Sequence, residues 1–363
     1  MIEKNEPLDE LDTPFVAIDL DKAEHNLRRW QTYCDEHGLR NRPHIKTHKL
    51  IEMAALQIEL RAIGLACQKL SEARAMIDGL SAVHRDRRLD VMIPYNIVGS
   101  TKAERAAALA GTVDLTLACD ALEVVRPLAQ AFAAAGKTAS MIVEFDSGAG
   151  RCGVSTVEEA VALALEIERM PGARYAGLMT YPPAGAASRV RAFFADTMAE
   201  LAGHGIETAI RSNGGTPDMW RAHEVDNATE HRAGTFIYYD RMQVAAGAAG
   251  LDDCALRVHA TVVSRHGDRA AIDAGSKALT SDMGKLEGHG LIWEYPEVRI
   301  TKLSEEHGHL DLSAASAKPR VGERVTIVPN HACPVSNLFD RVVGVRGGRV
   351  ERVLRVAARG CVT

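Results

Sequence analysis

The chain has 363 residues, of which 46% are hydrophobic and 25% charged, the balance of an ordinary globular protein. Its 43 basic and 48 acidic side chains give a net charge of −5, which argues against nucleic-acid binding because that function normally shows a basic excess. The length predicts one large domain and a smaller one, and the lack of a long apolar run argues against a membrane span.

The beginning of the chain, MIEKNEPLDELDTP, is polar and acidic and does not resemble a signal peptide. Cysteines are scattered along the sequence without CxxC spacing, at positions 34, 67, 119, 152, 254, 333 and 361. Isolated thiols of this kind are typical of a reduced, cytoplasmic protein, so we expect that location.

From about residue 40 to 240, short β-rich apolar runs alternate with Ala-rich amphipathic segments. The eight candidate strands are 42–46, 64–68, 90–94, 113–118, 140–146, 175–181, 208–212 and the run ending at 239. The helical segments between them include 102–110, 121–136 and 156–170. Eight strand–helix units predict a (β/α)8 TIM barrel, which we assign to residues 22–245. A doubly wound open sheet is the competitor, but no GxGxxG follows the first strand.

After about residue 250 the pattern changes to alternating, β-branched strands. They are expected at 257–265, 269–275, 297–304, 324–329 and 341–356, the last being a hairpin that turns at Gly347 and Gly348. The strand-like run 15–21 precedes the barrel. We therefore expect a smaller all-β domain made of residues 1–21 and 246–363.

The fragment RPHIKTHK, residues 42–49, places several basic groups at the end of the first barrel strand. In an extended chain Arg42, His44 and Lys46 share a face, and neighbouring cations lower the pKa of a lysine. Lys46 would then have the neutral amine that a Schiff-base nucleophile requires. A solvated basic patch at a strand end explains the same fragment equally well.

Other strand ends carry glycine-rich loops. The fifth strand leads into EFDSGAGRCGV, where Arg151 offers a planar donor fork. The seventh ends in RSNGGTPDMW, where backbone N–H groups before a helix expected from Pro217 form an anion site. This phosphate cup would comprise Ser212, Gly214, Gly215 and Thr216, completed by Gly234 and Thr235 from the eighth strand. A lysine on strand one and a phosphate cup at strands seven and eight together indicate pyridoxal 5'-phosphate.

These motifs, RPHIKTHK, EFDSGAGRCGV, GGTPDMW, EHRAGTFIYYD and the late PNHACPVSNLFD, resemble those of the D-threonine aldolase and D-serine dehydratase family. The members of this family are fold-type III pyridoxal-phosphate enzymes, distantly related to alanine racemase. The resemblance covers nearly the whole chain in the expected order, barrel first and β domain second.

The resemblance implies a role for each matching position. Lys46 would be the Schiff-base lysine, with Gln68 lining the cofactor pocket. Arg151 would face the phenolic oxygen of the cofactor, with Tyr181 beside the ring. Gly214, Gly215 and Thr216 would hold the phosphate, with Tyr238 at its edge. Without the family, both tyrosines read more simply as packed aromatics. Pro182 and Pro183 stand where some aldolases of the family have a histidine base, so the general base is not identified.

A metal pair is implied in the late motif NHAC. In an extended segment His331 and Cys333 point the same way, and imidazole and thiolate both bind Zn²⁺. On spacing alone, a structural histidine and a buried thiol are the simpler interpretation. The resemblance favours a metal pair instead, because the metal ligands of the family fall on these two positions. We expect a divalent metal, Zn²⁺, Mn²⁺ or Mg²⁺. Cysteine favours zinc, which the resemblance links to the dehydratases, whereas a carboxylate ligand would better suit Mn²⁺ or Mg²⁺; a divalent-metal aldolase with a His–Cys pair is compatible with the sequence. His307 is a candidate supporting group.

The resemblance implies a D-threonine aldolase that cleaves D-β-hydroxy-α-amino acids to glycine and an aldehyde. A D-serine or D-3-hydroxyaspartate dehydratase uses the same pocket, and the sequence separates the two reactions poorly. An amino-acid racemase is disfavoured because no second base is found, and a non-catalytic pyridoxal-phosphate carrier because of the additional domain. By analogy we expect a homodimer that acts on small D-amino acids.

Overall fold

The computed structural model describes residues 3–83 and 88–363. By its internal contacts the chain divides into two compact units. One, which we call the barrel unit, comprises Trp30–Lys46, Met53–Gly234 and Cys361–Thr363. The other, the β unit, comprises Met1–Arg29, Thr47–Glu52 and Thr235–Gly360.

The barrel unit contains a parallel sheet of eight strands in the order β2-β9-β8-β7-β6-β5-β4-β3. The strands are β2 Arg40–Asn41, β3 Leu65–Ala66, β4 Asp90–Ile93, β5 Asp114–Cys119, β6 Ala139–Glu144, β7 Ala173–Met179, β8 Ile210–Gly214 and β9 Glu230–Arg232. A parallel bridge between His44 and Ala66 joins the two ends of this order. The expected TIM barrel is confirmed.

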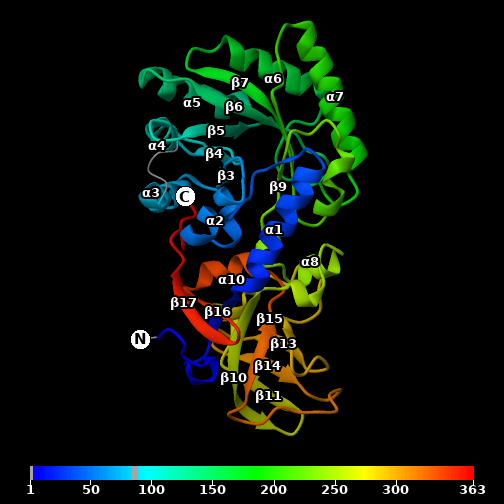
Figure 1. Ribbon diagram of the computed structural model, residues 1–363. Coiled ribbons are helices and arrows are strands. Elements are labelled where there is room, and N and C mark those ends of the chain that lie inside the picture. Colours follow the sequence, from blue (N-terminus) through cyan, green and yellow to red (C-terminus); the bar gives the residue numbers. More distant parts are fainter. Residues whose placement is uncertain (1–2, 84–87) are drawn as a thin grey trace. The chain divides into compact units, whose positions relative to one another are not determined.

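Helices follow the strands and lie on the outside of the curled sheet (Figure 1). They are α3 Leu70–Val83, α4 Ser100–Leu109, α5 Leu122–Ala134, α6 Val157–Arg169, α7 Ala187–Gly203 and the 3-10 helix η3 Met219–Glu224. The helices α1 Leu20–Glu36, which follows β1 Phe15–Asp19, and α2 Ile51–Glu59 each have residues in both units. In α5 the buried residues Val125, Leu128 and Phe132 recur at helical spacing and form the face that packs inward. The helix α6 begins with a capping box between Thr156 and Glu159.

The interior of the barrel combines an apolar layer with buried charges. Met92, Ala118, Ile142 and Met179, from four adjacent strands, form one hydrophobic cluster. A second group is polar: Arg42 binds Glu230 through Nε at 2.9 Å and Asp90 through Nη1 at 2.7 Å. Ser212 donates to Glu230 Oε1 at 2.5 Å, and Arg232 Nη1 donates to the Ser212 hydroxyl.

The strand β9 differs from the expected eighth strand. The strand is the polar tripeptide Glu230–Arg232, and all three side chains are buried. The apolar run that follows, expected to be extended, forms the 3-10 helix η4 Thr235–Ile237 instead. Its side chains are buried as a strand pattern suggests. The residues that pair with the neighbouring strand are nevertheless the polar ones, Glu230–Arg232. Their burial is possible because Arg42 binds Glu230 and the Thr180 carbonyl binds Arg232.

The β unit contains a nine-stranded sheet in the order β11-β14-β13-β12-β15-β10-β1-β16-β17, and β11 also pairs with β10. The strands are β1 Phe15–Asp19, β10 Leu256–His266, β11 Arg269–Ile272, β12 Leu291–Ile292, β13 Arg299–Leu303, β14 Gly308–Asp311, β15 Arg324–Val328, β16 Arg341–Arg346 and β17 Arg349–Arg355. Its helices are α8 Arg241–Ala245, α9 Ser276–Leu279 and α10 Ala332–Leu338, with the 3-10 helices η1 Leu8–Glu10 and η5 Leu251–Asp253.

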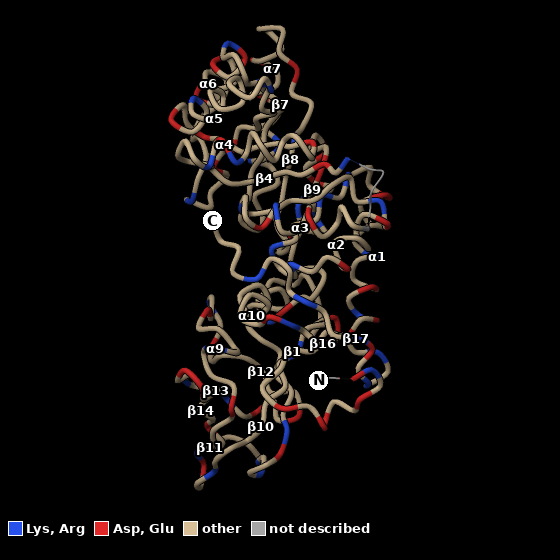
Figure 2. Tube along the Cα trace, turned by 90° about the vertical axis from the view of Figure 1, so that its left-hand side faces the viewer, with Lys and Arg blue, Asp and Glu red and all other residues tan. Residues whose placement is uncertain are grey.

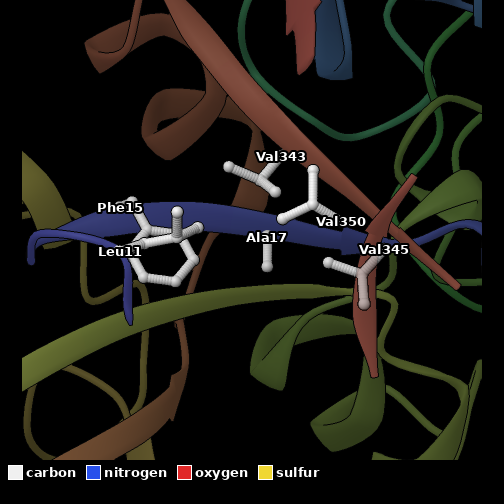
Figure 3. Packing of buried hydrophobic residues seen from close by; sticks show 6 residues of the cluster. All are labelled: Leu11, Phe15, Ala17, Val343, Val345 and Val350. Carbon is white, nitrogen blue, oxygen red and sulfur yellow. The ribbon is translucent and has the colours of Figure 1, made fainter. Parts of the chain in front are cut away.

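The early strand β1 belongs to this β sheet, as expected from the sequence. It pairs antiparallel with β10 and parallel with β16. Figure 3 shows the hydrophobic cluster around it, which comprises Leu11, Phe15, Ala17, Val343, Val345 and Val350. The hairpin β16–β17 turns at Gly347 and Gly348, whose φ angles of 57° and 75° explain the glycine pair.

Basic and acidic residues are interspersed along the described chain in both units (Figure 2). This distribution agrees with the mildly acidic composition. Among residues 3–83 and 88–363, no helix combines the length and the apolar character that crossing a membrane requires.

The buried ion pair of Arg42 gives the first prediction. Replacing Glu230 by Gln removes one of two carboxylates from a fully buried guanidinium, so we expect the free energy of unfolding to fall by about 3 kcal/mol. The matched control is Glu224→Gln, which breaks the exposed pair between Arg221 and Glu224 and should leave stability unchanged. Urea denaturation of both variants provides the measurement. Equal unfolding midpoints for the two variants would contradict this assignment.

The second prediction concerns His231, whose pKa burial lowers from 6.5 to about 4. The folded protein then holds this ring neutral while the unfolded chain takes up a proton below pH 6.5. Stability should therefore fall from pH 6.5 to 4, by about 1.4 kcal/mol per pH unit at most from this residue. His231→Gln should reduce that slope, measured by urea unfolding at several pH values; His259, whose pKa burial also lowers to about 4, maintains part of it. An unchanged slope would exclude the assignment.

Candidate active site

Lys46 lies where the first barrel strand ends. The chain stays extended as far as His44, whose N–H donates to the Ala233 carbonyl at 2.8 Å, while Ala66 N–H donates to the Pro43 carbonyl at 2.9 Å. It then turns into the 3-10 helix η2 Ile45–Thr47. The expectation of an extended segment through Lys46 is therefore wrong by two residues. The half-buried lysine still follows directly on the carboxyl end of its strand.

The crowding of positive charge expected around Lys46 is not what the structure shows. Two carboxylates compensate Arg42, and both bind it with two oxygens. Burial lowers the pKa of Arg42, but Glu230 and Asp90 outweigh that effect and raise it. His44 is hydrogen-bonded through Nε2 to Gln68 Oε1 at 2.8 Å. The two neighbours from which a neutral lysine was inferred, Arg42 and His44, thus both have polar partners of their own.

The glycine pair after β8 forms a tight, side-chain-free turn. Gly215 has a φ of +124°, a region that favours glycine. A Cβ at Gly214 would lie 3.1 Å from Nη2 of Arg232, so a larger residue would press on that guanidinium. The two N–H groups donate to Asn213 Oδ1 at 2.9 Å and to the Arg232 carbonyl at 3.2 Å. His231 Nε2 lies 2.8 Å from the Gly215 carbonyl.

The other members of the expected cup in the barrel unit meet at this turn. Gly234 N–H donates to Thr216 Oγ1 at 3.3 Å, and both residues are buried. The α-helix expected from Pro217 is absent from this part of the described chain. The chain forms the six-residue 3-10 helix Met219–Glu224 instead, so the anion site cannot draw on an α-helix terminus.

Arg151, Tyr181 and Gly215 lie close together in the barrel unit. The Arg151 guanidinium lies over the Tyr181 ring at 4.8 Å, and Nη2 is 3.6 Å from Glu144 Oε1. A Cβ on Gly215 would lie 3.6 Å from Cε2 of Tyr181, which places this ring beside the glycine turn. Asp146 accepts the N–H groups of two glycines in the Arg151 loop and so shapes it. Burial raises the pKa of Glu144, and Arg151 opposes the shift.

Ser212 and Arg232 are buried next to the glycine turn. The buried Ser212 hydroxyl is engaged by Glu230 and Arg232, so its visible role lies inside the barrel. Arg232 was not singled out from the sequence, although it stands in the quoted motif EHRAG. Its Nη2 donates to the Thr180 carbonyl at 2.7 Å, and burial lowers its pKa to about 10 against the opposing effect of Glu230. The available sequence signal for Arg232 was a charged residue within a segment expected to be a buried strand.

In the β unit, three of the singled-out residues share one neighbourhood. Cys333 Sγ lies 3.1 Å from Thr47 Oγ1 and 3.6 Å from Thr235 Oγ1. Tyr238 is fully buried, and its hydroxyl has no hydrogen-bond partner in the part of the chain that the structure describes. Burial raises its pKa well above 10, and Cys333 adds to the shift. A buried hydroxyl without a partner is what a phosphate oxygen would satisfy.

The pair His331 and Cys333 is close in space but not in the expected extended conformation. His331 is the N-cap of α10, and Cys333 lies in the first turn of that helix. His331 Nδ1 is 2.7 Å from Asp282 Oδ2, and Asp240 accepts the N–H of Ala332 at 2.9 Å. Burial lowers the pKa of His331, but hydrogen bonds to Cys333 and Asp282 raise it to about 9 overall.

These residues fit a zinc site that keeps open positions. Nδ1 of His331 faces the Asp282 carboxylate, the usual support of a metal-ligating histidine, so Nε2 would be the atom available to a metal together with the sulfur of Cys333. Within residues 3–83 and 88–363, no group of three metal-ligating side chains was found. A metal would therefore need water or substrate as further ligands. His307 is exposed, between β13 and β14.

Comparison with known proteins gives a consistent result over the whole chain. Residues 18–242 match the family model "Alanine racemase, N-terminal domain", and residues 255–345 match "Putative serine dehydratase domain". A D-threonine aldolase of Arthrobacter sp is 32% identical over 98% of this chain and 94% of its own.

Solved structures agree with these matches. The D-threonine aldolase of Filomicrobium marinum has a TM-score of 0.90 and 33% identity, with 99% of each chain covered. The D-threo-3-hydroxyaspartate dehydratase of Delftia sp. HT23 has a TM-score of 0.85 and 27% identity, covering 96% of this chain and 98% of its own. Structures of a dehydratase with that name include a cysteine variant in metal-free form and a variant of a histidine two positions earlier.

The resemblance stated from the motifs is thus confirmed. The barrel with its glycine turn, the β unit with its late His–Cys pair, and the full-length likeness all agree. The chain belongs to the alanine racemase-like family that includes D-threonine aldolase and D-threo-3-hydroxyaspartate dehydratase.

Proposed function

We propose that this protein is a pyridoxal-phosphate- and divalent-metal-dependent lyase of the D-threonine aldolase type. It would cleave D-β-hydroxy-α-amino acids between Cα and Cβ to give glycine and an aldehyde. The observation that carries this proposal is the likeness to the Filomicrobium marinum D-threonine aldolase, at TM-score 0.90 over 99% of both chains. The homodimer expected from the family stays a prediction.

The barrel unit would hold most of the cofactor. Bound pyridoxal phosphate supplies an electron sink for the negative charge that develops on the substrate carbon. In our proposal Lys46 provides the amine that binds its aldehyde. The phosphate would bind at the glycine turn and Thr216; in the β unit, the buried hydroxyl of Tyr238 is a donor without a partner among the described residues. In the barrel unit, Gln68, Arg151, Tyr181 and Gly234 would complete the pocket; Thr235 is the residue of the β unit that directly follows Gly234 in the chain.

Two arginine side chains of this pocket, Arg151 and Arg232, can orient a bound ligand before the reaction. The half-exposed guanidinium of Arg151 lies over the Tyr181 ring and 3.6 Å from Glu144, and its planar fork offers several donors to a ligand. Arg232 is held by the Thr180 carbonyl and the Ser212 hydroxyl and brings a buried positive charge next to the glycine turn. Such preorganised charges stabilise anionic groups without rearranging during the reaction.

In the β unit, His331 and Cys333 would hold the divalent metal, and Asp282 would orient the imidazole through Nδ1. The chemistry that such a metal supplies is Lewis-acid binding of the substrate hydroxyl. Asp240 fixes the backbone between the two ligands through the N–H of Ala332, which limits how far the pair can separate.

A dehydratase acting on D-serine or D-threo-3-hydroxyaspartate is the second candidate. The specific observation in its favour is the His–Cys pair. The dehydratase variants named above concern a histidine and a cysteine with the same two-residue spacing, and the cysteine variant is described as metal-free. Lower identity, 27% against 33%, places this candidate second.

The reaction itself is the third prediction. With pyridoxal phosphate and Mn²⁺ or Zn²⁺, the purified protein should convert D-threonine to glycine and acetaldehyde, measured with a coupled alcohol dehydrogenase assay. Lys46→Ala should lose this activity while keeping its fold. Release of pyruvate from D-serine, or of oxaloacetate from D-threo-3-hydroxyaspartate, without cleavage of D-threonine would instead establish the dehydratase.

The fourth prediction concerns the metal and can be read without activity. Elemental analysis after dialysis against Zn²⁺ should find about one metal ion per chain. Cys333→Ala and His331→Ala should each lower this occupancy at least about tenfold, because the one protein ligand that remains in each variant cannot hold the ion by itself. The matched control is Cys152→Ala, which removes an exposed thiol of the barrel unit and should keep the metal. Full occupancy in both ligand variants would refute the assignment.

A further inference from the structure

The side chain of His44 links the turn that carries Lys46 to two neighbouring strands. The backbone N–H of Lys46 donates to Nδ1 of His44 at 3.4 Å. On the other edge of the ring, Nε2 lies 2.8 Å from Oε1 of Gln68, which follows β3. The amide nitrogen of Gln68 in turn donates to the carbonyl of Pro94, after β4, at 3.4 Å. His44 itself is buried.

This chain of contacts determines which nitrogen of His44 carries the proton. Because a backbone N–H always donates, Nδ1 must present its lone pair to Lys46. Nε2 then carries the hydrogen and donates it to Oε1 of Gln68. The orientation of the Gln68 amide is fixed in the same sense, since its nitrogen donates to the carbonyl of Pro94. The imidazole is consequently neutral, in the Nε2–H tautomer.

The position of this ring is itself defined by the closure of the barrel. His44 is the last extended residue of its segment: it bridges to Ala66, and its N–H is bound by Ala233. The regular pairing ends there, and the 3-10 helix Ile45–Thr47 begins. The contact from Nδ1 to the N–H of Lys46 therefore extends the rigid part of the barrel by two residues, up to the lysine.

We propose that His44 is a positioning residue for Lys46 and that it acts in its neutral Nε2–H form. This inference rests on the proposed role of Lys46 as the cofactor lysine and deepens it. The contact joins residue 44 to the N–H two positions later, which is the spacing of an Asx turn. The side-chain oxygen of an Asn at position 44 can replace Nδ1 and accept the N–H of Lys46. The longer side chain of Gln places its amide at the position of Nε2, so it can replace only the bond to Gln68.

Two isosteric variants make the matched test. His44→Asn should retain the affinity for pyridoxal phosphate and the absorbance band of the lysine-bound cofactor at about 410–430 nm. His44→Gln should bind the cofactor about five- to tenfold more weakly, because one hydrogen bond to the lysine turn is lost. Fluorescence titration gives both affinities, and thermal unfolding verifies that the variants are folded. Equal affinities of the two variants would overturn the proposal.

A measurement on the unmodified protein keeps the proposal testable if His44→Gln does not fold. In ¹⁵N-histidine-labelled protein, the two-bond correlations of the His44 ring should show Nε2 protonated and Nδ1 unprotonated at neutral pH. An Nδ1–H tautomer or a charged ring would overturn the proposal. Failure of the proposed function is distinguishable: then neither the wild-type protein nor Lys46→Ala shows the cofactor band.

Discussion

The closure of the parallel barrel between the first and second strands is the constraint on which the proposed site depends. Residues 42–44 are hydrogen-bonded on both sides, to His231 and Ala233 on one and to Ala66 on the other. Because parallel strands bring their carboxyl ends to one rim, this closure carries Lys46, Gln68 and the glycine turn after β8 to the same end of the barrel. The extended segment ends where the 3-10 helix η2 begins, at Ile45, one residue before the lysine.

Buried charge is the second feature of this barrel, and it serves placement more than stability. Asp90, Arg42, Glu230, Ser212 and Arg232 form a continuous chain of ion pairs and hydrogen bonds through the interior. Desolvating such groups is costly, and apolar residues of the same volume often give equal or greater stability. What the chain provides is a fixed guanidinium beside Gly214. This explains why the polar strand β9 persists in a buried position.

Patterns local in sequence predicted the architecture, and contacts distant in sequence decided the site. Alternating strands and amphipathic helices indicated the barrel, and the strand-like run 15–21 was expected with the β strands, among which β1 does pair. The compensation of Arg42 depends on Glu230, 188 positions away, and no local pattern reports it. For the same reason the turns at Lys46 and at Thr235–Ile237 were mistaken for strand, since burial and β-branched residues favour both. The helical start at Cys333 was likewise missed.

The central claim is that the ε-amine of Lys46 binds the aldehyde of pyridoxal phosphate. Borohydride reduction of the cofactor-loaded protein, followed by tryptic digestion and peptide mass spectrometry, tests it most directly. We expect a single phosphopyridoxyl adduct on Lys46, with tryptic cleavage blocked after that residue. An adduct on another lysine, or a protein that takes up the cofactor without any reducible linkage, would contradict it.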